Sequence, residues 1–479
     1  MPVLAAATCV AALAAQDWAG AATARAERAA VELGADRVLR VAPVAPARLL
    51  AAVRAADPSG REAMAVVVTG AAGAAPVVAV DSTRFAAVTG APAEALQGTA
   101  PAPLEFTGTA LTLTAGGDGT RIRVALSVTG TGEQVGAEFG PLDPQPSART
   151  VAVPACDRGC RVDAIDADHG PVELRELTAG GRAVVDAGAF GDPARWRTTL
   201  GQAVSGIQVD QSGGGLRLVD AAPMSTSPVD SRLYAVNTPV PLPALVAGDA
   251  LPAHEEPVVT IFGATVPLAP HPVATVPRGG TGGIVVDLDY AQRIAAAGRP
   301  GGSGDRPEVW LGPAATDRTV DRLRAAGLTV IGDDTVDRAT VRAGRLAPAL
   351  ILLGGLVGAA AILLLGGVTA AVVAAVDRRQ RAAERAALRR QGVGRAALRT
   401  AGRWSALAPV LVGVPVGLLA AVALRLLAPP PVRPFTDRWP VTEPAVQPLA
   451  LGVVAVFALA VFAAVALAGA APKNGEERP

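Results

Sequence analysis

The sequence predicts an α-helical transmembrane bundle of four spans, the first one short, joined to an extracytoplasmic α+β domain with a β-sandwich-like insert. Three observations predict this fold class. The last third of the 479-residue chain contains three long apolar runs, the loop between the first two is rich in arginine, and the preceding region mixes helical with strand-like patterns. A net charge of +1 argues against a nucleic-acid-binding protein as a whole.

The three apolar runs near the C-terminus predict three transmembrane helices. Residues 346–376 are uncharged and exceed the about 20 residues that a helix needs to cross the hydrocarbon layer. Residues 404–424 form a second run with two prolines, which transmembrane helices tolerate when neighbours satisfy the freed backbone groups. Residues 449–471 form the third run. None of the three contains a charged residue, which argues against an ion path through them.

The arginine-rich loop predicts the orientation of these helices. Residues 377–403 hold nine arginines against two acidic residues. A short loop of this kind stays in the cytoplasm. The loop of residues 425–448 is then extracytoplasmic, the tail of residues 472–479 is cytoplasmic, and residues 21–345 form an extracytoplasmic domain.

The N-terminus allows three interpretations. Residues 1–20 are apolar but include Asp17, so they fit a short transmembrane helix, a signal peptide without a positive n-region, or a soluble apolar helix. Because the region before residue 346 must lie outside, an N-terminal span delivers it most simply. We therefore predict a first transmembrane helix, and its short length is compatible with a start part-way through a longer helix.

The extracytoplasmic domain begins and ends with α+β patterns. A helix continues over residues 21–33 as a stalk and ends at Gly34, and residues 46–56 predict a second helix. Strands such as AMAVVV and PVVAV follow, and strand and helix patterns return after residue 257. These patterns predict one α+β domain made of residues 35–100 and 250–335.

Residues from about 101 to 250 predict an inserted β-rich segment. Ile122, Val124, Leu126 and Val128 alternate with less apolar residues, and GIQVDQSGGGLRLVD is typical of a hairpin with a glycine-rich turn. Several such strands favour a β-sandwich. An extended β-rich lobe without closure is the alternative.

The cysteines predict one disulfide. Cys156 and Cys160 lie in PACDRGC, a short loop that can form a local disulfide outside the cytoplasm. A zinc site would need further ligands, which the neighbouring sequence lacks. Cys9 lies in an apolar stretch and is interpreted as a small buried residue.

A search for chemistry predicts that the chain is not an enzyme and holds no catalytic, cofactor-binding or metal site. Its only lysine is Lys473, so it cannot supply a P-loop lysine, and RGGTGG at residues 278–283 is interpreted as a loop. Asp287 and Asp289 suit acid/base chemistry on one strand face, or a cap for the helix that follows. A further group fits either a cation site or a solvated turn, and it comprises Asp163, Asp166, Asp168 and His169.

The order of one span, a large extracytoplasmic domain and three more spans resembles the FtsX-like (MacB-like) ABC transporter permeases of actinobacterial type. In this family the loop after the second span has an arginine-rich start, a Glu, a Leu-Arg pair, a turn with glycine and a further Leu. Gln380 departs from the pattern, because a Glu is common there. The matching loop residues here are Arg378, Arg379, Arg381, Glu384, Arg385, Leu388, Arg389, Arg390, Gly392, Gly394 and Leu398.

The resemblance implies a plasma-membrane permease subunit that couples ATP hydrolysis by a separate cytoplasmic ABC ATPase to movement of the extracytoplasmic domain, for export or mechanotransmission. The loop would dock on the ATPase, and the chain would act as a homodimer or beside a second permease half. Alternatively, the arginines only anchor the loop and bind anionic lipids. The rival functions are a membrane-anchored binding or sensor protein without an ATPase, and a membrane-anchored enzyme that uses the β-rich insert.

Overall fold

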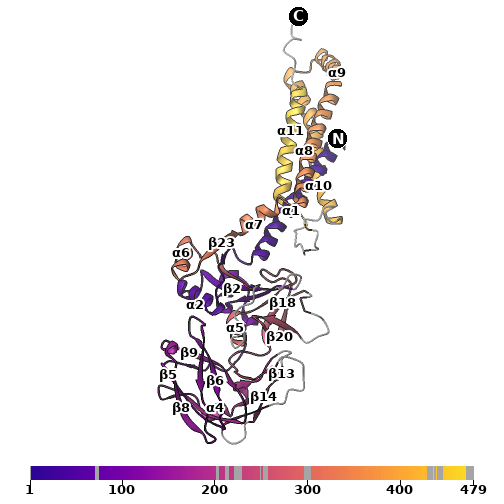
Figure 1. The fold of residues 1–479 in the computed structure, drawn as a ribbon. Coiled ribbons are helices and arrows are strands. Elements are labelled where there is room, and N and C mark those ends of the chain that lie inside the picture. Colours follow the sequence, from indigo (N-terminus) through magenta and orange to yellow (C-terminus); the bar gives the residue numbers. More distant parts are fainter. Residues whose placement is uncertain are drawn as a thin grey trace. The chain divides into compact units, whose positions relative to one another are not determined.

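The computed structural model divides into two compact units, Met1–Ala29 with Asp337–Pro479, and Ala30–Val336 (Figure 1). The first is a helical unit and the second is a sheet-rich unit. The residues that the structure describes are 2–70, 75–200, 204–210, 215–220, 229–248, 250–251, 257–295, 304–376, 378–428, 435, 439 and 446–470.

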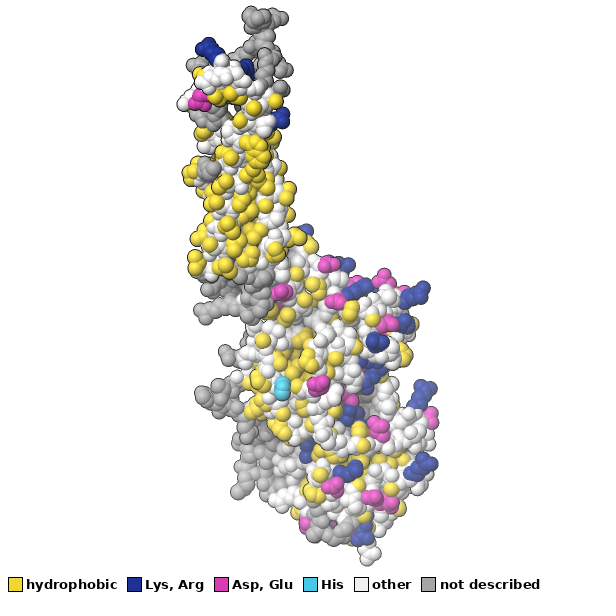
Figure 2. Space-filling view, turned by 180° about the vertical axis from the view of Figure 1, so that it is seen from behind, with side chains coloured by type: hydrophobic (Ala, Val, Ile, Leu, Met, Phe, Trp, Pro, Cys, Tyr) yellow, Lys and Arg dark blue, Asp and Glu magenta, His cyan; other side chains and the backbone are white. Residues whose placement is uncertain are grey.

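Four described helices in the helical unit are long and apolar enough to cross a membrane, which indicates a membrane protein. Figure 2 shows hydrophobic side chains over the sides of these helices and basic side chains near one end. The exposed hydrophobic residues include Leu350, Val357 and Leu419. The helices are α1 (Pro2–Leu33), α8 (Ala347–Val376), α10 (Arg395–Leu427) and α11 (Pro448–Ala470).

Small residues bring these helices close together. A Cβ atom on Gly417 of α10 would lie 2.4 Å from the backbone oxygen of Ala5 in α1. A Cβ atom on Gly366 of α8 would lie 3.2 Å from the Cβ of Ala7. Small residues at such contacts are typical of membrane helices, whose association depends on close packing.

Two helices extend beyond the predicted spans. α1 continues unbroken through the predicted stalk, and its Asp17 lies 3.8 Å from Arg425 near the end of α10. α10 already begins at Arg395, so residues 395–403 of the predicted loop are helical and continuous with the third span. Gly20 and Gly402 lie beside the two predicted boundaries, but both helices continue through them, and the alanines on either side favour the helix.

The first part of the sheet-rich unit is a nine-stranded sheet with helices on both faces. Its strand order is β19-β20-β18-β21-β3-β2-β22-β1-β23. The strands are β1 (Arg37–Val41), β2 (Ala63–Thr69), β3 (Val77–Val80), β18 (Leu242–Ala247), β19 (Val258–Ile261), β20 (Ala264–Val273), β21 (Ile284–Asp287), β22 (Arg306–Leu311) and β23 (Val330–Thr335).

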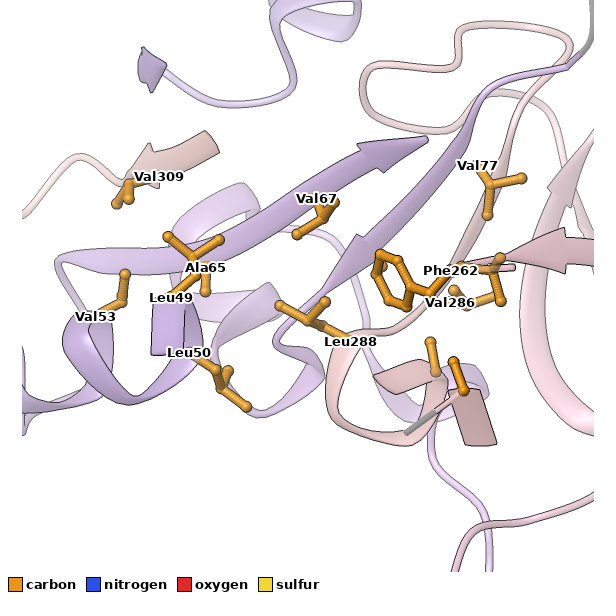
Figure 3. Close-up of a cluster of buried hydrophobic side chains, with 14 of the residues drawn as sticks. Leu49, Leu50, Val53, Ala65, Val67, Val77, Phe262, Val286, Leu288 and Val309 are labelled. Atoms are coloured by element: carbon orange, nitrogen blue, oxygen red, sulfur yellow. The ribbon is translucent and has the colours of Figure 1, made fainter. Parts of the chain in front are cut away.

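Alternate residues of β2 contribute to two different cores. Ala65 and Val67 belong to the core that includes residues of the helices α2 (Pro46–Ala56), α5 (Leu288–Ala295) and α6 (Asp317–Ala325). Figure 3 shows this core with Leu49 and Val53 of α2 near Ala65. Val66 and the residues two positions before and after it belong to the opposite core, with α3 (Ser82–Thr89) and the end of α1. Burial on both faces explains why this strand is a continuous apolar run.

The inserted segment is a β-sandwich whose two sheets share one core. One sheet has the order β14-β15-β10-β5-β8 with β11 beside β10, and the other has the order β12-β17-β9-β6-β7 with β4 beside β9. Their strands are β4 (Glu105–Phe106), β5 (Ala110–Gly117), β6 (Ile122–Val128), β7 (Gln134–Phe139), β8 (Ser147–Ala152), β9 (Cys160–Ala167), β10 (Val172–Ala179), β11 (Arg182–Val185), β12 (Trp196–Arg197), β14 (Ile207–Asp210), β15 (Leu216–Asp220) and β17 (Arg232–Ala235).

Two predictions about the insert can be compared with this structure. The predicted hairpin pairs β14 with β15 and places Val209 opposite Leu218. The predicted end of the insert near residue 250 is too late, because β18 belongs to the nine-stranded sheet. Leu242 and Leu245 of β18 lie in different cores, one on each face of that sheet. A strand buried on both faces is apolar throughout. The apolar pattern of β18 therefore does not show whether the strand belongs to the insert or to the nine-stranded sheet.

Shorter elements complete the described fold. β13 (Val204–Ser205) and β16 (Val229–Asp230) form a two-stranded sheet. Three 3-10 turns are η1 (Glu94–Leu96), η2 (Pro154–Cys156) and η3 (Pro193–Arg195). The remaining helices are α4 (Ala187–Phe190), α7 (Val336–Ala343) and α9 (Arg378–Arg390).

Candidate functional site

The predicted coupling loop forms a helix, a tight turn and the start of a second helix. α9 ends at Arg390, and Gly392 has a φ of +88°. The backbone N–H of Val393 donates to the carbonyl of Leu388, and that of Gly392 donates to the carbonyl of Arg389. This pair of hydrogen bonds is the Schellman motif, which ends a helix with a left-handed residue. Gly392 therefore supplies the one backbone conformation that the turn requires.

The start of α10 completes this turn. Gly394 is its N-cap in an extended conformation, and the carbonyl of Gly394 accepts from the N–H of Leu398. Leu398 is 8% exposed and therefore packs inside the helical unit. The turn thus joins an exposed helix to a helix that is anchored by a buried leucine. The structure brings the predicted coupling residues together in one continuous helix–turn–helix element.

α9 has a basic face with an exposed leucine at its edge. Positions 378, 381, 385 and 389 are three or four residues apart, so these arginine positions share one face. Gln380, Glu384 and Leu388 are four residues apart, but Leu388 also follows Arg385 by three residues, so it borders the basic face. Leu388 is 41% exposed, and Glu384 is exposed too. α9 therefore presents an exposed leucine at the edge of its basic face, which suits binding to another protein.

The two cysteines lie elsewhere, in the sandwich. A disulfide joins Cys156 and Cys160, whose Cα atoms are 5.0 Å apart. Both cysteines are completely buried, and they belong to the core between the two sheets. Their bond closes the turn that leads into β9. It is part of the scaffold of the sandwich.

The acidic group of the DAIDADHG segment is dispersed over separate partners. Asp163 accepts from Arg161 on the same strand, while Asp166 pairs with Arg232 of β17. Asp168 accepts from the backbone N–H of Arg121, and His169 lies beside it. Within the described ranges, no group of three or more such side chains is arranged to hold a metal ion.

The carboxylates Asp287 and Asp289 are on different elements. Asp287 ends β21 and accepts from the backbone N–H groups of Ser82 and Tyr290, so it caps α5 as one interpretation predicted. Asp289 lies in the first turn of α5 and pairs with Arg293. The expectation that both lie on one strand face is wrong, because the helix begins between them. Burial raises the pKa of Asp287. Burial is also the largest single effect on Asp289, but Arg293, Gln292 and Arg54 together outweigh it and lower the pKa of Asp289.

The glycine-rich segment at residues 278–283 is a loop, as predicted. Arg278 has a φ of +67°, and its guanidinium lies 2.7 Å from the fully buried carboxylate of Glu308. A Cβ atom on Gly283 would lie 2.4 Å from the Cα of Gly279, so the glycines let two backbone segments meet. The loop therefore has a packing role.

A cleft in the sheet-rich unit escaped the sequence analysis. Its volume is about 1000 Å³, and it lies between the outer face of one sandwich sheet and the helices α2 and α5. Five arginines line it, and they are Arg54, Arg123, Arg161, Arg232 and Arg293. These residues are far apart in the sequence. The one local signal is that Arg123 and Arg161 each stand between two buried apolar residues of their strand.

No protein-family model matches this chain, and no curated protein matches it. The function proposed below is therefore argued from the residues of the arginine-rich element and of the cleft.

Proposed function

We propose that this chain is the permease subunit of an ABC transporter, and that it couples ATP hydrolysis by a separate cytoplasmic ATPase to movement of its large extracytoplasmic domain. The observation that carries this proposal is the exposed, arginine-rich helix α9, joined through a Schellman turn to the membrane-capable helix α10. The proposal also draws on the resemblance of the loop to FtsX-like permeases.

The topology of the proposal depends on two independent signals. Nine arginines in residues 377–403 support a cytoplasmic side for that loop. The disulfide between Cys156 and Cys160 fits an oxidising compartment, which is outside the cytoplasm. The chain enters the sheet-rich unit after α1 and leaves it before α8, while α9 follows the other end of α8. The two signals therefore support the same topology, with the loop and the sheet-rich unit on opposite sides of the plasma membrane in this proposal.

The turn at Gly392 supports a mechanical role. An ATPase that binds α9 would exert force on a helix whose end is held by two backbone hydrogen bonds. Leu398, buried one turn into α10, would carry that force into the helical unit. In this proposal α10 and α8 tilt as the ATPase cycles, and the extracytoplasmic domain follows through α1 and α8. A homodimer, or a second permease half, would supply the second docking site that paired ATPase subunits require.

A pull-down in mild detergent tests this proposal. One variant changes Arg381, Arg385, Arg389 and Arg390 to Ser, which removes charge from α9 but leaves five arginines in the loop. A matched control removes four exposed arginines of the sheet-rich unit, namely Arg121, Arg182, Arg217 and Arg318. Protease protection of the sheet-rich unit checks that both variants keep the wild-type topology.

The expected result is that an ATP-hydrolysing subunit co-purifies with the wild type and with the control, but not with the α9 variant. If the ATPase co-purifies equally with the α9 variant, the four arginines do not dock the ATPase, and their role is to anchor the loop at the lipid surface. Absence of any ATPase in all three samples would favour the membrane-anchored binding or sensor protein, for which the cleft of the sheet-rich unit is the relevant feature.

A further inference from the structure

The cleft of the sheet-rich unit has one wall made of a sheet and one made of helices. The outer face of the sheet with β6, β9 and β17 forms the first wall, and α2 and α5 form the second. The turn between β6 and β7 meets the start of α2, where a Cβ atom on Gly132 would lie 2.1 Å from the Cβ of Ala47. This close contact sets the two walls against each other at one end of the cleft.

Strand register arranges the sheet wall as two polar rows. Arg123 of β6 and Arg232 of β17 both lie opposite Asp166 of β9, so the three form one row. Ser127 of β6 lies opposite Arg161 of β9, which in turn lies opposite Glu105 of β4. The two rows are four residues apart along β6, about 13 Å for an extended strand. That separation matches four to five residues of an extended peptide.

Small residues separate the two polar rows. Ala125 of β6 lies between Gly136 of β7 and Ala164 of β9. These three positions carry a methyl group or no side chain at all, whereas arginines stand in the row on either side. The sheet wall is therefore a shallow trough with basic edges, rather than a flat surface.

Two arginines of the cleft form hydrogen bonds to buried carboxylates that lie outside the cleft. Arg161 donates to Asp163 at 2.8 Å, and Arg54 of α2 makes two hydrogen bonds of 3.0 Å to Asp81. Asp81 and Asp163 are buried and do not line the cleft. A guanidinium has five N–H donors in a rigid fork, so a carboxylate on one edge leaves donors on the other. Arg123 has neither an ion pair nor a hydrogen bond to any residue that the structure describes.

The side of the cleft opposite the sandwich sheet adds acceptors and apolar surface, from α2, α5 and the segments that precede α2 and β22. Gln292 Oε1 and Asp305 Oδ2 are buried and have no hydrogen-bond partner among the described residues. Such groups need a donor, because a buried acceptor without one costs about 1–3 kcal/mol. Val44 and Leu50 contribute apolar surface beside them. A ligand of this cleft should therefore carry acidic groups, N–H donors and apolar side chains together.

We propose that the cleft binds an extended, acidic peptide segment of an extracytoplasmic partner. Its carboxylates pair with Arg123 and Arg161, and its backbone N–H groups face Gln292 and Asp305. A phosphate group would satisfy the arginines but has no N–H donor for the two acceptors, so the peptide fits better. The proposal does not require an ATPase partner, and it holds for a permease or for an anchored binding protein.

Fluorescence anisotropy on the purified full chain in detergent tests this proposal. The probe is a short labelled peptide that alternates Glu and Val, and the comparison peptide has Gln in place of Glu. Arg123→Ser removes one basic edge, and Ala125→Trp fills the trough. Matched controls are Arg182→Ser and Ala148→Trp, both at exposed positions outside the cleft. Thermal melting checks that each variant is folded. If Ala125→Trp does not fold, Arg123→Ser still tests the proposal.

The expected result is binding of the acidic peptide, weakened about tenfold or more by each cleft variant and unchanged by both controls; tenfold corresponds to 1.4 kcal/mol. Equal binding of the Gln peptide, or equal loss in the control variants, would overturn the proposal. Binding of glycerol phosphate through Arg123, with no binding of either peptide, would assign the arginines to phosphate and overturn it as well.

Discussion

The indole ring of Trp310 lies against the backbone of Gly34, so closely that a Cβ atom at residue 34 would stand 2.4 Å from Cη2 of the ring. Gly34 ends α1 with a φ of +93°, as a helix C-terminus requires. Trp310 is completely buried in β22, and its Nε1–H donates to Glu308. The end of α1 and the nine-stranded sheet therefore meet at a position that only glycine can occupy.

Gly34→Ala is expected to destabilise the sheet-rich unit by about 3 kcal/mol or more, because it adds both backbone strain and a clash with a rigid ring. Gly90→Ala is the matched control, since Gly90 also has a positive φ, +73°, but open space where its Cβ would lie. It should cost only about 1 kcal/mol. Hydrogen exchange of β22 in the full chain measures both effects, and equal protection in the two variants would contradict the packing argument.

Leu388→Asp is expected to leave membrane insertion intact and to uncouple the ATPase. Leu388 is 41% exposed at the edge of the basic face of α9, three residues after Arg385, so the change removes a contact surface without opening a core. Gln380→Asp adds the same charge at an exposed position on the same face and should have a smaller effect. The measurement is ATP turnover of the assembled complex, and turnover equal to the wild type in Leu388→Asp would sink the docking role of this face.

The two glycines of the turn after α9 are expected to differ in their tolerance of alanine. Gly392→Ala should destabilise the turn by about 1 kcal/mol, because Gly392 has a φ of +88°. Gly394→Ala should be nearly neutral, because Gly394 has a φ of −63° and open space around it. Hydrogen exchange of the Val393 amide, which closes the Schellman motif, reports the difference. Faster exchange in Gly394→Ala than in Gly392→Ala would contradict this account of the turn.

Asp57 is expected to make the sheet-rich unit sensitive to acid. Burial alone would raise its pKa, but hydrogen bonds from Ser59, Glu62 and Ala63, together with Arg84, outweigh burial and lower the pKa below its ordinary value of 3.8. A lowered folded-state pKa adds stability above the unfolded pKa, and that stability is lost as the pH falls below about 3.8 toward the folded-state pKa.

Asp57→Asn should therefore destabilise the unit by about 3 kcal/mol at neutral pH, because it breaks a buried ion pair. The difference from the wild type should shrink once the pH falls below about 4. Asp118→Asn, at an exposed position, is the control and should change little. Hydrogen exchange of β2, quenched after labelling at each pH, gives the profile. A difference that stays constant down to pH 2 would rule out the role given to this carboxylate.

Asp17 and Arg425 are expected to couple α1 to α10. Their charged groups lie 3.8 Å apart, and their side chains are only 13% and 8% exposed. Replacing either residue breaks this buried ion pair and should destabilise the helical unit by about 3 kcal/mol, which is measured as a lower melting temperature in detergent. The double variant Asp17→Ala with Arg425→Ala should be less destabilised than the sum of the two single variants. Strict additivity would show that the two residues do not interact.

Local patterns predicted much of the fold because each pattern contains its own physical cause. Long charge-free runs predicted the three C-terminal helices, since a helix buried in a soluble protein is rarely so long without a charged residue. The glycine after Leu33 predicted the end of α1, since a left-handed residue ends a helix. The assignment of strands to sheets was harder to predict. β18 resembles its neighbours in the insert, and only pairing with β20 and β21 assigns it to the nine-stranded sheet.

The cleft could not be predicted from the sequence. Arg123, Arg161 and Arg232 are separated by tens of residues, and the sequence contains no sign of which strands lie side by side. Strand register placed Arg123 and Arg232 opposite the same aspartate. Likewise, the partner of Asp17 lies about four hundred residues away, where only the packing of α1 on α10 brings it.

The sequence by itself therefore determined the membrane-capable helices, the arginine-rich loop, the two interleaved parts of the sheet-rich unit and the cysteine pair, because hydropathy, charge density and turn chemistry act over short stretches of chain. Only the tertiary structure decided the boundary of the insert, the separation of Asp287 from Asp289 and the arginine-edged cleft. Those features depend on long-range pairing of strands and helices, and the free energy of that pairing is shared among residues that are distant in the chain.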